Sequence, residues 1–334
     1  MTVSPPGSGY DETKVAIVIP LYNDAENIGR AIECAVRQEV PAGTTFEVIV
    51  VDDCSTDEGP SIAEEYARRY EQVVFHRQPR NLGPSGARNA ALRSTNAGWF
   101  TPFDSDDVME PARIARLLER GRRQGLDIVA DNLIITHNDA PTTAVRRLWP
   151  GKPAGDIELT PELFLERSSH VELERSELGF LKPLIRRSSL IGDDPAPYLE
   201  ELRFGEDFEL YARMLLNGAK AMLTDPEGYY FVCREGSASR SQGREDHMRL
   251  ARISRELLRR PGISAVSRKA LQEHTAYCER EWAVWASIEA VRSKSIPRFL
   301  EAYTISFPAS LHVTGRMFDA VVARAASGFR KQPN

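Results

Sequence analysis

The sequence predicts an α/β fold in which helices flank a doubly wound, mostly parallel sheet, with a helical extension at the C-terminal end. Between residues 15 and 135, apolar β-branched runs alternate with segments of helical spacing, which is the pattern of a parallel sheet. Most of these runs end in polar residues, as strands do at the ligand-binding edge of such a sheet. After Asp246 the chain is almost entirely helical in pattern, with breaks near Pro261 and Pro297.

The expected elements follow one another regularly. The run 15–19 is stopped by Pro20 and is typical of a buried parallel strand. In the next segment, 24–38, apolar residues recur at helical spacing. Further strands are expected at 46–51, 73–75, 98–103 and within 127–135. Further helices are expected at 61–70, 85–93 and 111–124.

The pattern weakens beyond residue 137. The stretch 138–202 is rich in proline and reads as loops, and long loops in compact domains are often functional. A helix at 206–217 and short strands at 219–224 and 229–232 follow. We therefore expect a disordered N-terminus, a main domain with two halves, and a helical extension. Their boundaries are 1–14, 15–137 with 138–240, and 241–334.

Charge is unevenly distributed along the 334 residues. The net charge of −5 gives no electrostatic footprint for nucleic acid. From Glu245 onward, however, there are 15 Lys and Arg against 9 Asp and Glu. A basic C-terminal part beside an acidic body favours an anionic partner such as a membrane surface.

The four cysteines are far apart and lack the spacing of a zinc site, which fits a reducing compartment. The segment 1–14 has neither the basic nor the apolar region of a signal peptide. No apolar run approaches the ~20 residues that span a bilayer. We expect a cytoplasmic protein, either soluble or peripheral at the cytoplasmic face of the membrane.

The most informative feature is the acidic run Asp104-Ser105-Asp106-Asp107. It follows the expected strand 98–103, so its carboxylates fall at the carboxyl edge of the sheet. Clustered carboxylates repel one another unless they are solvated or share a divalent cation. A solvated, helix-capping turn is the simpler alternative, because Pro111 soon begins a helix.

Other nucleotide and metal motifs do not fit. No Gly-x-Gly-x-x-Gly follows the first strand, and no Walker A sequence occurs. A calcium loop that started at Asp104 would need Gly and Glu where the chain has Met109 and Ala115.

Five motifs occur in a specific order, at residues 19–23, 50–55, 81–89, 103–107 and 205–207. Their order and spacing resemble the inverting family 2 glycosyltransferases of the GT-A fold, especially bacterial exopolysaccharide sugar transferases. The resemblance extends over roughly 15–236. Each motif alone is weak, and the combination carries the specificity.

The resemblance implies transfer of a sugar from a nucleoside diphosphate sugar, with UDP favoured, to a hydroxyl of a glycan or lipid-linked oligosaccharide. A single displacement would invert the anomeric centre. Mg²⁺ or Mn²⁺ would stabilise the leaving diphosphate as a Lewis acid. The half 15–137 would bind the nucleotide sugar, and the half 138–240 would bind the acceptor.

The resemblance also assigns roles to the acidic residues. Asp106 would ligate the metal directly, and Asp104 would join the metal site by reaching the ribose or a metal-bound water. Asp107 would orient a neighbour. Asp207 would be the general base, and Glu206 an acceptor-side contact. For Glu206 and Asp207, capping of a helix start is the structural alternative.

The nucleotide would be held at the first two strand ends. Tyr22 can stack on a base, Pro20 shapes that pocket, and Asn23 belongs to the same motif. One carboxylate of the pair Asp52 and Asp53 would accept a hydrogen bond from the uracil imide. Asp52 is favoured over Asp53, and both remain candidates.

The helix that starts near residue 83 adds phosphate or base contacts. Gly83 and Gly86 allow close backbone approach, and Arg88 lies in the first turns of this helix. Downstream, Arg234 or Arg240 could contact the diphosphate, with an exposed basic loop as the alternative.

Two other functions remain open at this point. A sugar-nucleotide nucleotidyltransferase also uses carboxylate-bound metal, but it usually opens with a Gly-rich basic loop where this chain has 20–24. A non-catalytic nucleotide-sugar-binding protein could keep the same fold.

A lipid-linked acceptor would place the protein at the membrane, and the helical extension carries a matching row of basic and apolar residues at 248–260. Packing of its apolar residues against protein is the alternative, and a homodimer is a further possibility. The arginines of this row are Arg249, Arg252, Arg255, Arg259 and Arg260.

Overall fold

The computed structural model describes residues 9–137, 142–169, 177–190, 196–234, 244–305 and 309–315. The chain divides into two compact units. Residues 1–168 and 172–237 form the first unit, and residues 238–334 with 169–171 form the second. The five sequence motifs all fall in the first unit.

An eight-stranded sheet forms the core of the first unit, in the order β3-β2-β1-β4-β10-β6-β11-β9. Strands β1, β2, β3 and β4 run parallel, so their carboxyl ends share one edge. This arrangement confirms the predicted mostly parallel sheet. The strands are β1 (Asp11–Leu21), β2 (Thr45–Asp52), β3 (Val73–Arg77), β4 (Ala97–Pro102), β6 (Ile128–Asp131), β9 (Ile157–Glu158), β10 (Leu184–Arg186) and β11 (Ala221–Thr224).

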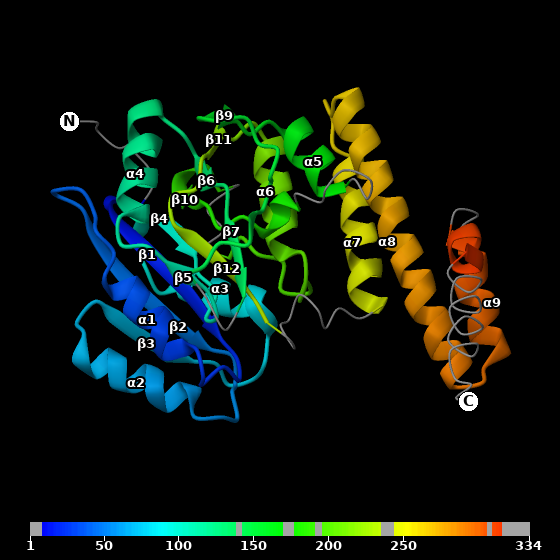
Figure 1. The fold of residues 1–334 in the computed structure, drawn as a ribbon, viewed down its shortest axis with the longest axis horizontal. Helices are drawn as coiled ribbons and strands as arrows, with labels where there is room; N and C mark the ends of the chain where they lie inside the picture. The colour runs from blue at the N-terminus through cyan, green and yellow to red at the C-terminus, as the bar shows by residue number, and fades with distance from the viewer. Residues whose placement is uncertain are drawn as a thin grey trace, which may run out of the picture. The chain divides into compact units, whose positions relative to one another are not determined.

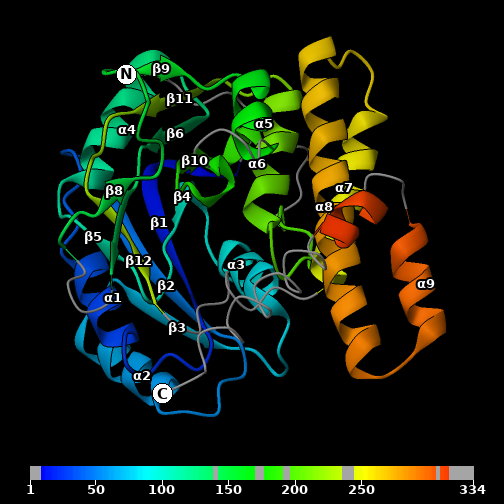
Figure 2. The ribbon, with the colours of Figure 1, turned by 45° about the vertical axis from the view of Figure 1, so that its right-hand side comes forward.

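Helices cover both faces of this sheet. Figures 1 and 2 show α1, α2 and α4 on one side and α3 and α6 on the other. The apolar spacing in α1 has its predicted effect, because Ile28, Ile32 and Ala35 are buried. The helices are α1 (Ile28–Val36), α2 (Gly59–Arg69), α3 (Gly83–Arg93), α4 (Arg113–Gln124), α5 (Pro161–Ser169) and α6 (Glu206–Leu216).

A second sheet of four short strands has the order β5-β12-β7-β8. The sequence predicted one strand within 127–135, but the chain there forms two, β6 in the main sheet and β7 (Ile134–His137) in the second. The partners of β7 in this sheet are β5 (Val108–Met109), β8 (Arg146–Arg147) and β12 (Tyr229–Cys233).

The stretch 138–202, which was expected to form loops, contains α5 and the short strands β8, β9 and β10, which the sequence did not predict. β10 pairs antiparallel with both β4 and β6, so it lies in the interior of the main sheet. The 3₁₀ turns Leu178–Phe180 and Arg187–Ser189 flank it. Residues just before β10 therefore lie close to the end of β4.

The N-terminal prediction needs one correction. Residues 11–14 were expected in a disordered tail, but they begin β1. The backbone N–H of Asp11 donates to the carbonyl of Asn96 at 2.7 Å, and Thr13 donates to the Asp11 carboxylate. These bonds give the polar start of the strand partners that its sequence does not reveal. Residues 1–8 lie outside the described residues.

The second unit is helical, as predicted, with α7 (Arg244–Leu258), α8 (Ala265–Arg292) and α9 (Ile296–Thr304). On α7 the apolar residues Leu250, Ile253 and Leu257 are buried. The apolar half of the expected basic and apolar row is therefore packed against protein. None of the described helices is long and apolar enough to cross a bilayer.

Three arginines of this row on α7 lie near carboxylates. Arg249 lies 3.3 Å from Asp246, and Arg252 lies 3.7 Å from Glu256. Arg255 pairs with Glu279 on α8. Exposed pairs of this kind contribute little to stability, and they partly neutralise the basic row.

Candidate active site

The carboxyl ends of β1 and β2 are tied together by side chains. Asn23 has a φ of 48°, an unusual value for a residue other than glycine. Its backbone N–H donates to Ser55 Oγ at 2.9 Å, and its Oδ1 accepts from the Thr56 N–H at 2.8 Å. Asn23 thus joins the two strand ends that were predicted to bind the nucleotide. Beside it, the Tyr22 side chain is 54% exposed, which leaves a ring face available for stacking.

Asp52 ends β2 and Asp53 follows it, and the two buried carboxylates have different surroundings. Asp52 Oδ1 accepts from the Ser55 N–H at 3.0 Å. Its Oδ2 lies 3.1 Å from Arg77 Nε in ion-pair range, but the angle is not that of a hydrogen bond. No other described residue donates a hydrogen bond to that oxygen. Oδ2 of Asp52 is therefore a buried acceptor atom that receives no hydrogen bond from the described residues.

Asp53 instead organises the start of α3. Its carboxylate accepts from Gln78 Nε2 and from the backbone N–H groups of Leu82 and Gly83, at 2.7 to 3.0 Å. Burial raises the pKa of Asp53, and the two backbone donors oppose that rise. Gly83 has a φ of +77°, which explains a glycine at the point where the chain turns into α3.

The aspartates of the acidic run after β4 have different surroundings. Asp107 has a structural role. Its carboxylate accepts from Tyr229 Oη at 2.7 Å and from the Val232 N–H at 2.8 Å. It thereby fixes β12 beneath the acidic run. Burial, followed by the charges of Asp106 and Asp104, raises the pKa of Asp107 well above its usual range. The prediction that Asp107 orients a neighbour agrees with this position.

The carboxylate of Asp106 forms an ion pair with Arg234. Arg234 Nε lies 2.6 Å from Asp106 Oδ2, and its Nη1 lies 2.9 Å from Asp24 Oδ1. Burial and the neighbouring Asp104 raise the pKa of Asp106, while Arg234 lowers it. Ser105 closes the group by donating to Asp24 Oδ2 at 2.5 Å. Asp24, which the sequence did not single out, therefore belongs to the site.

Asp104 and Asp207 are joined by two buried cations. Lys182 Nζ lies 3.0 Å from Asp104 Oδ2 and 2.8 Å from Asp207 Oδ2. Arg88 lies 2.9 Å from Asp104 Oδ1 and 3.6 Å from Asp207 Oδ1. We call these four residues the charge ring. Glu206 attaches to it through Arg88 at 2.6 Å.

The contacts of the charge ring keep Asp104, Lys182 and Arg88 ionised. Burial raises the pKa of Asp104, but Lys182 and Arg88 more than offset this and bring it to about 2. Burial lowers the pKa of Lys182, and the two carboxylates reverse that effect and raise it above its ordinary value. For Glu206, burial prevails over the attraction of Arg88 and raises its pKa. The carboxylate oxygen Asp207 Oδ1 is buried and accepts no hydrogen bond from the described residues.

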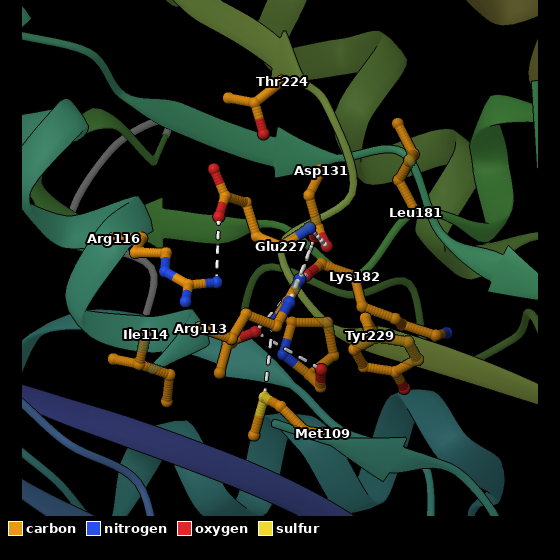
Figure 3. Close-up of polar contacts among 12 residues, drawn as sticks. Met109, Arg113, Ile114, Arg116, Asp131, Leu181, Lys182, Thr224, Glu227 and Tyr229 are labelled. Carbon is orange, nitrogen blue, oxygen red and sulfur yellow. Dashed lines mark hydrogen bonds and ion pairs between the residues drawn. The ribbon is translucent and has the colours of Figure 1, made fainter. Parts of the chain in front are cut away.

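Arg113 and its partners form a cluster of polar contacts next to Lys182, as Figure 3 shows. Arg113, the first residue of α4, donates to Asp131 Oδ1 at 2.7 Å and to the backbone carbonyl of Lys182. Its guanidinium also lies over the Tyr229 ring, 4.8 Å from the centroid. Both Arg113 and Asp131 are completely buried. One cation thus links α4, β6, the Lys182 segment and β12.

The structure brings together most of the predicted residues and adds some that were missed. Arg88, Asp104, Glu206 and Asp207 converge in or on the charge ring, whereas Tyr22, Asn23 and the Asp52–Asp53 pair lie at the ends of β1 and β2. Pro20 is part of β1, and Arg240 lies outside the described residues. Lys182 was missed, although a single lysine within the apolar stretch 180–185 signals a buried charge that needs a partner.

Comparison with known proteins decides the family. The sequence model of Glycosyl transferase family 2 matches residues 16–170. The succinoglycan biosynthesis protein ExoO of Rhizobium meliloti (strain 1021) is 30% identical over 94% of this chain and 88% of its own length. ExoU of the same organism, another succinoglycan biosynthesis protein, is 32% identical over 90% and 85%. The chain belongs to glycosyltransferase family 2.

Solved structures agree on the GT-A fold of this glycosyltransferase. The S. aureus TarS 1-349 complex with UDP-GlcNAc has a TM-score of 0.62 at 19% identity, over 86% of this chain and 90% of its own. The mannosyltransferase PcManGT from Pyrobaculum calidifontis, in complex with GDP-Man and Mn²⁺, has a TM-score of 0.50 at 18% identity. It covers 99% of this chain and 84% of its own.

The glycosyltransferase site contains several carboxylates, which are ligands of the kind that Mg²⁺ and Mn²⁺ commonly take. Among the described residues, no three Asp, Glu, His or Cys side chains form a complete metal site. Mg²⁺ commonly uses one or two carboxylates and takes its other ligands from phosphates and water. Arg234 already places a positive charge between Asp24 and Asp106. The site also has more carboxylates than cations, with Asp24, Asp104, Asp106, Glu206 and Asp207 against Arg88, Lys182 and Arg234.

Proposed function

We propose that this family 2 glycosyltransferase moves a sugar from a UDP-sugar to a hydroxyl of a glycan or lipid-linked oligosaccharide during surface polysaccharide synthesis. The succinoglycan names of its relatives and the UDP-GlcNAc of the TarS complex support the acceptor and donor classes. The structural observation that carries the proposal is the proximity of Asp104 and Asp207 through shared cations.

In this reaction Asp207 is the general base. Its Oδ1 is buried without a hydrogen-bond donor among the described residues, and buried polar atoms of this kind normally have a partner. An acceptor hydroxyl would supply that partner and give up its proton to Oδ1. General-base action contributes roughly 10²- to 10⁴-fold to the rate.

The acceptor oxygen attacks the anomeric carbon from the face opposite the nucleotide, so one displacement inverts the configuration. The bond from the sugar to the diphosphate breaks as the new glycosidic bond forms, and the nucleoside diphosphate leaves. Glu206, which pairs with Arg88 at 2.6 Å, would contact the acceptor. Tyr22 stacks on the base, Pro20 and Asn23 shape its pocket, and Asp52 or Asp53 accepts from the uracil imide.

Asp106 would hold the Mg²⁺ or Mn²⁺, with Asp104 beside it in the same site. When bound, this cation neutralises charge on the leaving diphosphate as a Lewis acid. Gly83 leaves room at the start of α3, Arg88 keeps Asp104 ionised, and Arg234 or Arg240 would contact the diphosphate.

The two other candidate functions make different predictions from a transferase. A nucleotidyltransferase would release inorganic pyrophosphate from a nucleoside triphosphate and a sugar phosphate, and a binding protein would release nothing. The deciding experiment follows UDP release from labelled UDP-sugars with Mn²⁺ and with extracted glycan or lipid-linked acceptors. UDP release coupled to label transfer supports the transferase, and its absence from every donor contradicts it.

A further inference from the structure

Lys182 is fixed from three directions. Its backbone carbonyl accepts from Arg113 on α4, and the carbonyl of the preceding Leu181 accepts from Tyr211 Oη on α6 at 3.1 Å. Its ammonium is held between Asp104, after β4, and Asp207, on α6. Backbone and side chain are thus both fixed, so the ammonium has little freedom to move.

The ion pair between Arg113 and Asp131, next to Lys182, is not expected to add much to the free energy of unfolding. Both side chains are fully buried, and a buried ion pair often contributes less than an apolar pair of similar volume. Such pairs can instead specify one arrangement of the residues around them. Here the extra Arg113 donor goes to the Lys182 carbonyl, as Figure 3 shows. The arrangement that it specifies is therefore the position of Lys182.

The ammonium of Lys182 also sets the orientation of Asp207. It takes Asp207 Oδ2 at 2.8 Å, which leaves Oδ1 as the carboxylate oxygen without a hydrogen bond from the described residues. The other carboxylate on Lys182 is Asp104, on the donor side of the site. One cation therefore fixes the base relative to the donor side.

We propose that Lys182 is a positioning residue for sugar transfer, which holds Asp207 with Oδ1 turned to the acceptor hydroxyl at a set distance from Asp104. The inference rests on the proposed function. Misplacing a reacting group by about 1 Å can cost ~10²-fold in rate. Lys182 should therefore affect turnover much more than nucleotide binding.

The test compares Lys182→Met with Lys152→Met in the full chain. Lys152 is a matched control, because it is also buried and pairs with a carboxylate, Asp225, at 3.1 Å outside the site. UDP binding is measured by calorimetry with Mn²⁺, and UDP release from UDP-GlcNAc and UDP-glucose gives kcat and KM. For Lys182→Met we expect kcat to fall roughly 10²-fold and UDP affinity to change less than about threefold. Lys152→Met should leave kcat unchanged.

A second variant, Lys182→Arg, distinguishes a loss of activity in Lys182→Met from a failure of that variant to fold. Lys182→Arg keeps a cation that reaches both carboxylates, so it should fold and bind UDP like the wild type but recover only part of kcat, whereas a merely structural lysine would allow full recovery of kcat once the variant folds. Unchanged kcat in Lys182→Met overturns the inference. So do equal losses in kcat and UDP affinity in both Lys182→Met and Lys182→Arg. A wild-type protein that releases no UDP from any of the labelled UDP-sugars instead overturns the proposed function, and the inference with it.

Discussion

Arg234 Nε lies 2.6 Å from Oδ2 of Asp106, although the two residues are 128 positions apart in the chain. The same guanidinium reaches Asp24, at the end of β1. The side chain therefore places its charge between two carboxylates that a divalent cation would also attract. A guanidinium and a cation cannot share Asp106 Oδ2, so they should compete.

Arg234→Gln should tighten Mn²⁺ binding in the absence of nucleotide by roughly tenfold, because a positive charge that competes for Asp24 and Asp106 is removed. Calorimetric titration of Mn²⁺ measures this directly. Arg120→Gln, which removes an ion pair with Asp156 and Glu227 elsewhere in the unit, is the control. Weaker Mn²⁺ binding in Arg234→Gln would contradict the competition.

Asp106→Ala should abolish turnover and weaken UDP-sugar binding, because the diphosphate loses its counter-charge. The measurement is UDP release and donor affinity with and without a chelator. Full activity of this variant in the presence of the chelator would remove Asp106 from the metal site.

Asp207→Asn should retain donor and Mn²⁺ binding but lose roughly 10²-fold or more in kcat, because an amide cannot take the proton. Single-turnover kinetics with saturating donor give the value. Glu209→Gln, two residues along α6 and paired with Arg213, should change kcat little. If the Asn variant lost donor affinity while the bound complex still turned over, Asp207 would be a binding residue.

The Asp52 and Asp53 variants separate base recognition from folding. Asp52→Asn should weaken UDP binding roughly tenfold and reduce the preference for UDP over CDP, because the amide no longer accepts as a charged group. Asp53→Asn should lower thermal stability, since its oxygens accept two backbone donors at the start of α3. Calorimetry and thermal unfolding provide the two readouts. If Asp53→Asn weakened UDP binding and Asp52→Asn did not, Asp53 would be the base-binding carboxylate.

His274 predicts acid sensitivity of the helical unit. It is buried and contacts Ser254 Oγ at 2.7 Å, and burial, followed by the nearby His247, lowers its pKa from 6.5 to about 4. Between these values the unfolded chain binds a proton that the folded chain does not, so the free energy of unfolding falls as pH decreases. From pH 7 to pH 5 the loss is about 2 kcal/mol.

Chemical denaturation of the wild type and of His274→Gln at both pH values isolates this effect. The variant lacks the titrating group, so its stability should fall less over the same interval. Equal losses in the two proteins would show that other groups dominate.

The arginines of the basic and apolar row 248–260 provide the test of membrane contact. Leu250, Ile253 and Leu257 are buried, so attraction to an anionic leaflet would be electrostatic, about 1 kcal/mol per arginine before screening by salt. The triple change of Arg252, Arg255 and Arg259 to Glu should abolish salt-sensitive pelleting with anionic vesicles. Equal pelleting with neutral and anionic vesicles, or none with either, rules out this contact.

Sequence patterns were sufficient where short-range order decides the structure. The run before Pro20 and the run before Asp104 each became a buried strand with polar residues at its end. Parallel strands bring those ends to one edge regardless of the details of packing. For this reason the motifs at Tyr22, Asp52 and Asp104 could be placed together before the fold was known.

The residues that connect the site could not be predicted in the same way. Lys182, Asp24 and Arg113 acquire their roles through partners far away in the chain, and no local periodicity records such pairs. β10 itself was missed because it is only three residues long and comes from a proline-rich stretch. Its place in the sheet depends on β4 and β6 rather than on its own propensity.

The position of β10 also constrains how the protein is made. β4 and β6 leave the ribosome well before residues 184–186, which lie between them in the finished sheet. Until then each presents an open strand edge, and such edges pair readily with foreign chains. A fragment that ends at residue 137 would lack β10 and β11, so one edge of β4 would stay open and β6 would have no partner in the main sheet. We therefore expect that residues 15–137 and 138–240, although consecutive in the chain, do not fold separately, and that splitting the chain between them yields aggregation-prone pieces.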